Sequence, residues 1–387
     1  MLVHNRYLEK GGEDGIFEAE KNLLEKYDHD VEEYLDSNQR IMSRNRIALA
    51  INALWSFETN RKLTQLLKST KPSIVHFHNT FPLISPSAYY VCREHHIPVV
   101  QTLHNYRLLC PGATLFDGSR ICTKCLDIGS LSHAILNACY RNSRPQTFVT
   151  AAMILLHRLI GTWKHRVQIY IALTKYAKKK FVRAGLPGER ILIKPNFVYP
   201  DPGKSDGMGN FALYIGRLSK EKGLETLIES WRYLKHIPLK IAGSGPLEDR
   251  LMAIQERDKL DRIEFLKEVP NHKIFPLIKN ARFLILPSRC DEMFPTVILE
   301  AFACGIPVIA SRLGSIAEIL KEEKTGLFFE PGDPVNLAEK VKWAWKNHRS
   351  MREMGQIARE EYLIKYTAER NYRTLKEIYH TALKYAQ

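Results

Sequence analysis

Apolar and polar positions alternate along the chain in the pattern of short strands separated by helices. Apolar runs of about four residues are followed by longer stretches in which apolar residues recur every three or four positions. The expected strands are Leu2–His4, Ile74–His78, Val99–Leu103, Ile169–Leu173, Ile191–Lys194, Phe211–Ile215, Leu239–Ala242, Arg262–Leu266, Phe283–Leu286 and Val308–Ala310. The expected helices include Gly15–Lys26, Ala48–Lys68, Ala177–Ala184, Leu224–Leu234, Leu247–Lys259 and Val335–Asn347. This alternation predicts parallel sheets covered by helices, an α/β fold.

A single Pro-, Gly- and Asp-rich stretch, residues 196–210, has the composition of a linker. It divides the chain into a first domain, residues 1–197, and a second domain, residues 198–360. The first domain contains a Cys-rich insertion at 110–139, and residues 361–387 are expected to form a helix that packs back on the first domain. We therefore expect two doubly wound parallel-sheet domains that face a cleft lined by the carboxyl ends of their strands.

The overall composition is that of an ordinary globular protein. Of the 387 residues, 45% are hydrophobic and 26% are charged, and no apolar run approaches the ~20 residues of a membrane-spanning helix. The N-terminal residues lack the apolar segment of a signal peptide. We expect a cytoplasmic protein whose seven cysteines are reduced thiols or metal ligands rather than disulfides.

The net charge of +15 is unevenly distributed. Residues 1–39 carry 4 Lys and Arg against 11 Asp and Glu, whereas residues 40–200 carry 23 against 5. A basic half suits anionic lipid headgroups, a polyanionic acceptor or nucleic acid, and a solvated surface without a partner is the alternative. Residues 141–166 combine an apolar stretch with flanking basic residues and Trp163, which fits either an interfacial helix or a buried helix. We expect contact with an anionic membrane on the inner face of the plasma membrane, and no nucleic acid, because recognition-helix signatures are missing.

A helical stretch near residue 300 is almost wholly apolar and is interrupted by one charge, Glu300. An ionised carboxylate in apolar surroundings is costly unless a partner hydrogen-bonds to it, so such a residue is usually retained because it binds something. Glu292 lies eight residues earlier, and the N–H groups of Met293, Phe294 and Thr296 lie at the expected helix start. Such N–H groups lack partners and meet the positive end of the helix dipole. This combination favours a ligand that carries hydroxyl and phosphate groups.

Two glycine-containing loops follow expected strands in the same half of the chain. In GRLSKEKG, residues 216–223, Gly216 permits a tight turn, Arg217 can make a forked contact to phosphate oxygens, and Lys222 adds a point charge. In the loop that contains Gly243, the glycine allows the backbone to approach a ligand. The alternatives are a basic strand-to-helix loop and a plain turn.

With these residues in place, the second half resembles a retaining glycosyltransferase of family 4, which has the GT-B fold. The matching segments are Gly216-Arg217, Lys222-Gly223, Gly243 to Leu247, Leu286-Pro287-Ser288, Glu292 to Glu300 and Gly305-Ile306-Pro307-Val308. The resemblance implies that Arg217 and Lys222 bind the diphosphate of a sugar nucleotide. It implies that Glu292 and the N–H groups of Met293, Phe294 and Thr296 bind the sugar, that Glu300 binds the ribose, and that Val269 contacts the base. One departure is Pro295, which has no N–H where the family usually has a glycine-rich run.

The first half resembles the same family more loosely. Gly11 and Gly12 follow the first expected strand and resemble the family's glycine loop over the donor phosphates. His104 falls where the family has an active-site histidine, and a structural histidine is the alternative. The segments at 76–82 and 102–112 each end an expected strand. The candidate acceptor contacts are Asn79, His104, Asn105 and Tyr106.

Four cysteines in the insertion form the pattern C-x11-C-x2-C-x13-C. The inner C-x2-C pair is typical of tetrahedral zinc sites, and four thiolates would complete one. The candidate ligands are Cys110, Cys122, Cys125 and Cys139, with His133 as a competing ligand. A structural zinc ion that takes no part in the chemistry is one hypothesis, and free or redox-active thiols are the other.

The resemblance implies a retaining glycosyltransferase of the hexosyltransferase type. It would move a sugar from a nucleotide-diphosphate-sugar donor to a hydroxyl acceptor, such as a lipid-linked or cell-surface polysaccharide precursor. The expected catalytic residues are His104, Arg217, Lys222 and Glu292. We expect no cofactor, because Arg217, Lys222 and helix dipoles would neutralise the diphosphate in place of a metal ion. The alternatives are a GT-B enzyme that acts on the sugar nucleotide itself, such as a hydrolysing epimerase, and a non-enzymatic polyanion-binding protein.

Overall fold

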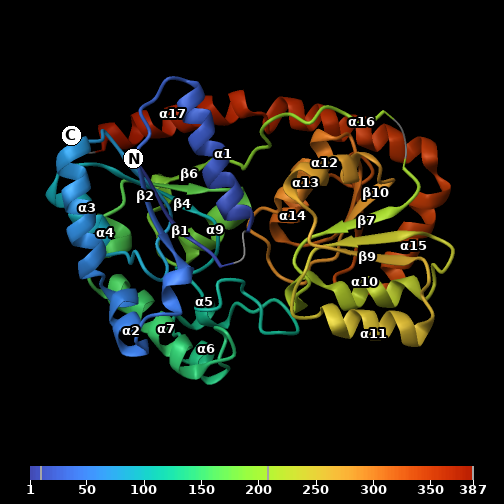
Figure 1. The fold of residues 1–387 in the computed structure, drawn as a ribbon, viewed down its shortest axis with the longest axis horizontal. Helices are drawn as coiled ribbons and strands as arrows, with labels where there is room; N and C mark the ends of the chain where they lie inside the picture. Colours follow the sequence, from blue (N-terminus) through green and yellow to red (C-terminus); the bar gives the residue numbers. More distant parts are fainter. Residues whose placement is uncertain (9–10, 207–208, 386–387) are drawn as a thin grey trace. The chain divides into compact units, whose positions relative to one another are not determined.

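The computed structural model describes residues 1–8, 11–206 and 209–385, and the chain forms two compact units (Figure 1). The first unit comprises Met1–Leu115, Cys122–Asn196 and Asn371–Gln387, and the second comprises Phe116–Ile121 and Phe197–Arg370. The boundaries thus lie at 196/197 and 370/371, where the sequence analysis placed them at 197/198 and 360/361.

The first unit is built on a parallel sheet with the strand order β2-β1-β3-β4-β5-β6. Its strands are β1 Leu2–Arg6, β2 Glu33–Ser37, β3 Val75–Asn79, β4 Val99–Leu103, β5 Ile169–Ala172 and β6 Ile191–Ile193. Its helices are α1 Gly12–Lys26, α2 Arg46–Leu54, α3 Phe57–Thr70, α4 Ala88–Glu94, α5 Lys124–Ile128, α6 Ser132–Leu136, α7 Arg144–Leu159, α8 Thr162–His165, α9 Lys175–Arg183 and α17 Ala368–Lys384, with 3₁₀ turns at Asn38–Ile41 and Gly188–Arg190. The strand order reverses between β1 and β3, as in doubly wound folds.

The second unit repeats this arrangement with the strand order β12-β11-β10-β7-β8-β9. Its strands are β7 Ala212–Ile215, β8 Leu239–Ala242, β9 Ile263–Lys267, β10 Phe283–Leu286, β11 Val308–Ser311 and β12 Gly326–Phe329. Its helices are α10 Leu224–Trp231, α11 Glu248–Asp258, α12 Asn271–Lys279, α13 Thr296–Ala303, α14 Gly314–Ile319, α15 Pro334–Lys346 and α16 His348–Lys365, with a 3₁₀ turn at Lys220–Lys222. The two parallel six-stranded sheets confirm the expected pair of Rossmann-like α/β domains.

The sequence analysis missed two strands, β2 and β12, and both lie at a sheet edge. In β2 only Tyr34 and Asp36 are buried, and its other residues are partly or fully exposed. An edge strand covers little of the core, so it does not need the continuous apolar run that marks a central parallel strand such as β5.

The C-terminal segment forms two helices where one was expected over residues 361–387. Helix α16 ends at Lys365 and belongs to the second unit, and α17 begins at Ala368. Leu375, Ile378 and Ala382 of α17 share a buried core with residues of the first sheet and of α1. Figure 1 shows α17 in red beside α1, and the rings of Tyr27 and Tyr372 stack with centroids 3.7 Å apart. Helix α17 therefore completes the core of the first unit.

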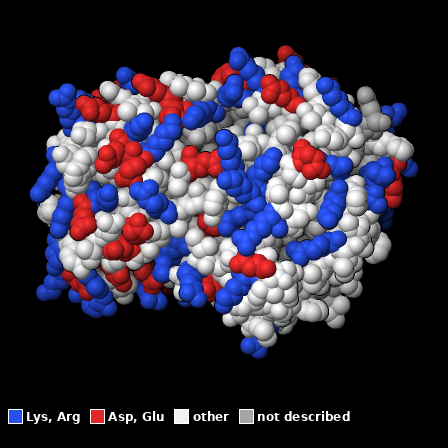
Figure 2. Space-filling view, turned by 180° about the vertical axis from the view of Figure 1, so that it is seen from behind, with Lys and Arg blue, Asp and Glu red and all other residues white. Residues whose placement is uncertain are grey.

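The apolar segment at 141–166 forms α7 and α8. Helix α7 buries some of its apolar side chains and exposes others. Ala151, Ile154 and His157 are buried, whereas Phe148 and Leu159 are exposed. Figure 2 shows one face of the molecule on which Lys and Arg side chains are more abundant than Asp and Glu. Among the residues that the structure describes, no helix combines the length and the apolar character needed to cross a membrane.

We predict that Leu375→Ala loosens the first unit, because truncation of this fully buried side chain leaves a cavity that costs about 2–5 kcal/mol. Amide hydrogen exchange in β5 and β6 should accelerate, while exchange in β7 and β8 stays unchanged. The control is Lys376→Ala, which changes an exposed neighbour on the same helix. Equal exchange rates in β5 for the two variants would show that α17 does not stabilise this core.

Candidate functional site

The loops that follow β7, β8 and β10 pack together through their glycines. Gly243 has φ +137°, and a Cβ atom there would lie 1.9 Å from the carbonyl oxygen of Gly216. A Cβ atom on Gly223 would lie 1.8 Å from the carbonyl oxygen of Pro287. Side chains at these positions would collide with backbone, so glycine permits the contact. The parallel strands thus bring the three loops to one edge of the second sheet.

Lys222 and Glu292 form an ion pair at this edge. Lys222 Nζ donates to Glu292 Oε1 over 2.5 Å, and the Ser288 hydroxyl donates to the same oxygen over 2.7 Å. Burial acts to lower the pKa of Lys222, but the Glu292 carboxylate outweighs burial and raises it above its ordinary value. Lys222 therefore carries a fixed positive charge, and Arg217 is exposed on the same loop. The structure brings together the predicted residues of this loop and adds Ser288, which the sequence analysis quoted only as part of a matching segment.

Helix α13 starts beside Glu292. Met293 and Phe294 are buried and precede the helix, Pro295 is the N-cap residue, and α13 begins at Thr296. Glu300 lies one turn into this helix and is partly buried, and its carboxyl group has no hydrogen-bond partner among the described residues. Burial raises the pKa of Glu300 to about 7. The carboxyl group can therefore change its charge near neutral pH when a ligand binds.

Val269 lies in the loop between β9 and α12 and is partly buried. Its contact with a base stays a prediction.

In the first unit, Gly11 and Gly12 lie at the start of α1, a helix of 15 residues. Both are exposed, and a Cβ atom on Gly11 would meet nothing within 4 Å. The Gly11 N–H donates to Asp14 Oδ2 over 2.9 Å, and Asp14 Oδ1 lies 2.8 Å from His4 Nε2. The start of this helix is thus exposed but already capped by Asp14, and the contact of Gly11 and Gly12 with donor phosphates stays a prediction.

Glu13, which the sequence analysis did not select, links this helix start to the loop after β4. Asn105 Nδ2 donates to Glu13 Oε1 over 2.8 Å, and the Asn105 side-chain oxygen accepts the Arg107 N–H over 2.9 Å. Burial raises the pKa of Glu13, against the opposing effect of the Asn105 hydrogen bond. A glutamate in the first turn of a helix is common because it interacts favourably with the helix dipole, so no sequence pattern singles out Glu13.

Two of the predicted acceptor contacts, Asn79 and Tyr106, are buried side chains, and their contact with an acceptor stays a prediction. The Asn79 amide donates to the Asn5 carbonyl over 2.9 Å and accepts the Phe81 N–H over 3.0 Å, so its polar atoms hold the backbone. Tyr106 is fully buried and stacks on Phe181 with centroids 5.7 Å apart. Both side chains belong to the interior and shape the loops that carry Asn105 and His104.

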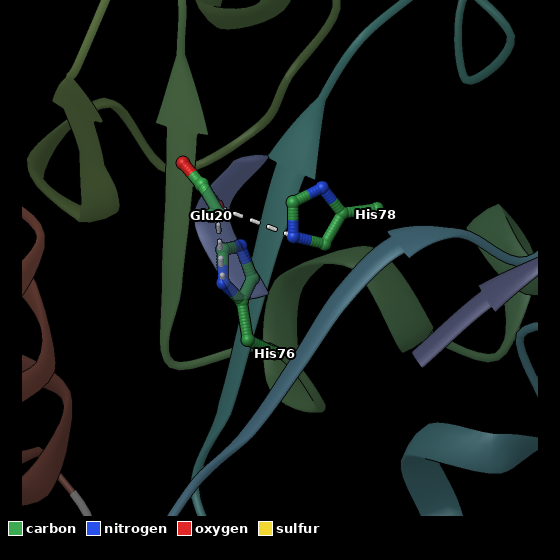
Figure 3. A group of neighbouring side chains, drawn as sticks. All are labelled: Glu20, His76 and His78. Carbon is green, nitrogen blue, oxygen red and sulfur yellow. Dashed lines mark ion pairs between the residues drawn. The ribbon is translucent and has the colours of Figure 1, made fainter. Parts of the chain in front are cut away.

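His104 follows β4 and lies at the end of a buried polar chain. Its Nε2 is 3.0 Å from Nδ1 of His78, and His78 Nε2 is 3.3 Å from Glu20 Oε2. Glu20 in turn forms a buried ion pair with Lys194. Figure 3 shows Glu20 from α1 reaching His76 and His78, which both project from β3. The sequence analysis selected His104 but not the residues behind it.

The Cys-rich insertion contains α5 and α6, and the isolated pairing of Phe116 with Ile121. Cys110 and Cys125 are buried, and Cys122 and Cys139 are partly buried. Burial raises the pKa of the Cys125 thiol, and the nearby thiols of Cys110 and Cys122 raise it further. The zinc site stays a prediction.

Two family models match the chain, Glycosyltransferase Family 4 over residues 23–201 and Glycosyl transferases group 1 over residues 198–361. The chain is 28% identical over 209 residues to the uncharacterized glycosyltransferase MJ1178 of Methanocaldococcus jannaschii, covering 54% of this chain and 58% of that protein. It is also 28% identical over 160 residues to the D-rhamnosyltransferase WbpZ of Pseudomonas aeruginosa, covering 41% and 42% respectively. The chain thus spans about half the length of the curated relatives it matches.

The fold is similar to that of Alr3699/HepE from Anabaena, whose crystal structure was determined in complex with UDP. The TM-score is 0.68 at 16% identity, over 97% of this chain and 98% of that chain. The same protein has been crystallised with UDP-glucose. Since the two family models together span residues 23–361, the chain belongs to the GT-B glycosyltransferases that join a Family 4 first domain to a group 1 second domain.

Proposed function

We propose that this protein transfers a sugar from a nucleotide-diphosphate-sugar donor to a hydroxyl acceptor with retention of the anomeric configuration. The observation that carries this proposal is the Lys222–Glu292 ion pair beside the start of α13. A fixed cation, a carboxylate and a helix N-terminus suit a diphosphate joined to a polyhydroxylated sugar. The family assignment and the UDP complexes of the Anabaena protein support the same class of donor.

In this proposal the donor binds the second unit. Lys222 and Arg217 bind the diphosphate, Glu292 and the N–H groups that precede α13 bind a hexose, and Glu300 accepts hydrogen bonds from the ribose. The acceptor binds the first unit, where Asn105 and His104 follow β4.

The rate enhancement would come mainly from electrostatic stabilisation of the departing diphosphate. Negative charge develops on the leaving phosphate, and Lys222 and Arg217 are positioned to neutralise it. We assign no protein nucleophile and no metal ion to this step. The leaving phosphate accepts the proton of the acceptor hydroxyl, while Glu292 holds the sugar in place.

A lipid-linked acceptor is supported by an exposed apolar surface on the first unit. Ile47 and Ile51 of α2 and Phe148 and Leu159 of α7 are all exposed. The two helices are joined where His157 Nε2 lies 2.9 Å from the Leu54 carbonyl oxygen. Apolar side chains next to a strongly basic half of the chain suit the surface of an anionic membrane. We propose that this surface binds the membrane that carries the acceptor.

We predict that Lys222→Ala lowers kcat about 100-fold or more, because the variant removes a charge aimed at the leaving diphosphate. The assay measures release of the nucleoside diphosphate from a donor selected by thermal shift among UDP-, GDP-, ADP- and TDP-sugars. The matched control is Lys220→Ala, which removes an exposed lysine from the same 3₁₀ turn. Equal turnover of the two variants would show that Lys222 does not act on the leaving diphosphate. Donor consumption without any acceptor would instead favour an enzyme that acts on the sugar nucleotide itself.

We also predict that affinity for the nucleoside diphosphate rises about tenfold between pH 6 and pH 8 in the wild type. The pKa of Glu300 is about 7 in the free protein, and ribose hydroxyls favour its charged form, so binding releases a proton. Affinity therefore grows as the pH rises through 7 and levels off above it. Titration calorimetry should show that the affinity of Glu300→Gln depends less on pH. The phosphate groups of the ligand also titrate in this range, but they affect both proteins equally. The same pH dependence of affinity in both proteins would show that Glu300 does not bind the nucleotide.

For the membrane surface, we predict that Leu159→Glu reduces co-sedimentation with phosphatidylglycerol vesicles at least about tenfold. The substitution removes apolar burial and adds a charge that the anionic surface repels. The control is Ile364→Glu, because Ile364 is 68% exposed on α16 of the second unit and Leu159 is 84% exposed. Equal loss in both variants, or no wild-type binding to these vesicles, would contradict the assignment.

A further inference from the structure

Four buried side chains of the first unit form a chain that leads from an ion pair to His104. Lys194 and Glu20 are each 1% exposed and form an ion pair. Glu20 Oε2 lies 3.3 Å from His78 Nε2, and His78 Nδ1 lies 3.0 Å from His104 Nε2. Figure 3 shows the ion-pair contacts that Glu20 makes with both histidines of β3. The series therefore runs from Lys194 through Glu20 and His78 to His104, and Glu20 Oε2 also lies 3.9 Å from His76 Nδ1.

The ion pair determines which nitrogen of His78 carries its proton. Burial alone would raise the pKa of Glu20, but the Lys194 ammonium and His78 outweigh burial and hold it well below its ordinary value. The ionised carboxylate has no hydrogen to donate and lies 3.3 Å from His78 Nε2 as an ion-pair contact without hydrogen-bond geometry, so its charge favours the hydrogen of His78 on Nε2. Burial also lowers the pKa of His78, which keeps the ring neutral with a single N–H. His78 Nδ1 must then accept a hydrogen bond.

The same reasoning fixes the proton of His104. Since His78 Nδ1 accepts, His104 Nε2 donates, and a neutral His104 ring has no proton left for Nδ1. Burial lowers the pKa of His104 well below its ordinary value, and His78 lowers it further. His104 Nδ1 has no hydrogen-bond partner among the residues that the structure describes. It is thus an acceptor that a ligand can use.

The surrounding groups do not disturb this arrangement. His76 lies 3.9 Å from Glu20, but its Nδ1 contacts the Tyr379 hydroxyl at 2.9 Å and its Nε2 contacts the Thr102 hydroxyl at 2.7 Å. The ligand atoms of Glu20, His76 and His78 lie within 4.8 Å of one another, which is close enough to hold a metal ion. Lys194 already supplies the cation that Glu20 needs, and His76 uses both ring nitrogens. Glu20, His76 and His78 therefore suit a hydrogen-bonding network better than a metal site.

We propose that Glu20 and His78 are positioning residues that fix His104 as the Nε2–H tautomer, so that its bare Nδ1 accepts a hydrogen bond from a hydroxyl of the acceptor. This inference rests on the proposed function, which places the acceptor on the first unit beside His104. It adds a specificity rule: the group opposite His104 must be a hydrogen-bond donor, and a phosphate or carboxylate is excluded there. Lys194 acts through Glu20, since it keeps the carboxylate charged.

The test is ¹⁵N NMR of the full chain labelled at histidine, which distinguishes the two tautomers and the imidazolium. In the wild type, His104 should be protonated at Nε2 between pH 6 and pH 8. In Glu20→Gln, the Gln oxygen faces Lys194 and its amide then donates to His78, so both histidines should switch tautomer. Sugar transfer should fall about 10- to 100-fold in kcat with little change in UDP affinity, as expected for loss of a supporting residue. The control is Tyr379→Phe, which breaks a contact of His76 and should leave the His104 tautomer unchanged.

The wild-type spectrum is decisive even where Glu20→Gln does not fold. An imidazolium or an Nδ1–H tautomer of His104 in the wild type would overturn the inference. So would a Glu20→Gln protein with an unchanged tautomer and unchanged kcat. Failure of the proposed function gives a different result, because UDP binding and sugar-nucleotide turnover would then be absent in the wild type whatever the tautomer of His104.

Discussion

Each sheet of this protein is wholly parallel, and the position of every candidate site residue depends on that constraint. Parallel strands end at the same edge of the sheet, so the loops that follow them gather there. In the second unit this edge holds Gly216 after β7, Gly243 after β8 and Glu292 after β10. In the first unit it holds His104 after β4 and the glycines that begin α1 after β1. Most candidate site residues therefore lie in loops that the sheets position, while Glu300 lies on α13 and Glu20 on α1.

Paired charge is the second feature common to both units. Lys222 is paired with Glu292 in the second unit, where both are partly buried, and Lys194 is paired with Glu20 in the first, where both are fully buried. Burying such a pair costs desolvation free energy that the mutual attraction repays only in part, so it contributes little to stability. Glu300 has no such partner, and its raised pKa reflects that cost. These charges fit roles in binding and in holding protons better than a role in folding.

The sequence predicted the central strands well, because buried parallel strands are continuous apolar runs. The bounds of β4, β8 and β10 agree with the predicted ranges residue for residue. The edge strand β2 was missed because it has no such run, and the short strand β12 was also missed although its four residues are apolar and buried. A lone carboxylate in an apolar helix drew attention to Glu300, and Glu20 occupies the same kind of position between Phe17 and Leu24 on the buried face of α1. Its partner Lys194 lies 174 residues away, a pairing that no local pattern contains.

The most direct test of the account is an amide hydrogen-exchange footprint of the full chain with and without UDP, GDP, ADP and TDP. If the loops of the second unit bind a nucleoside diphosphate, at least one of these ligands will slow exchange at residues 216–223 and at the start of α13. Exchange in the basic helix α9 of the first unit should not change. Protection confined to α9, or no protection by any of the four ligands, would contradict the account and indicate a polyanion-binding protein instead.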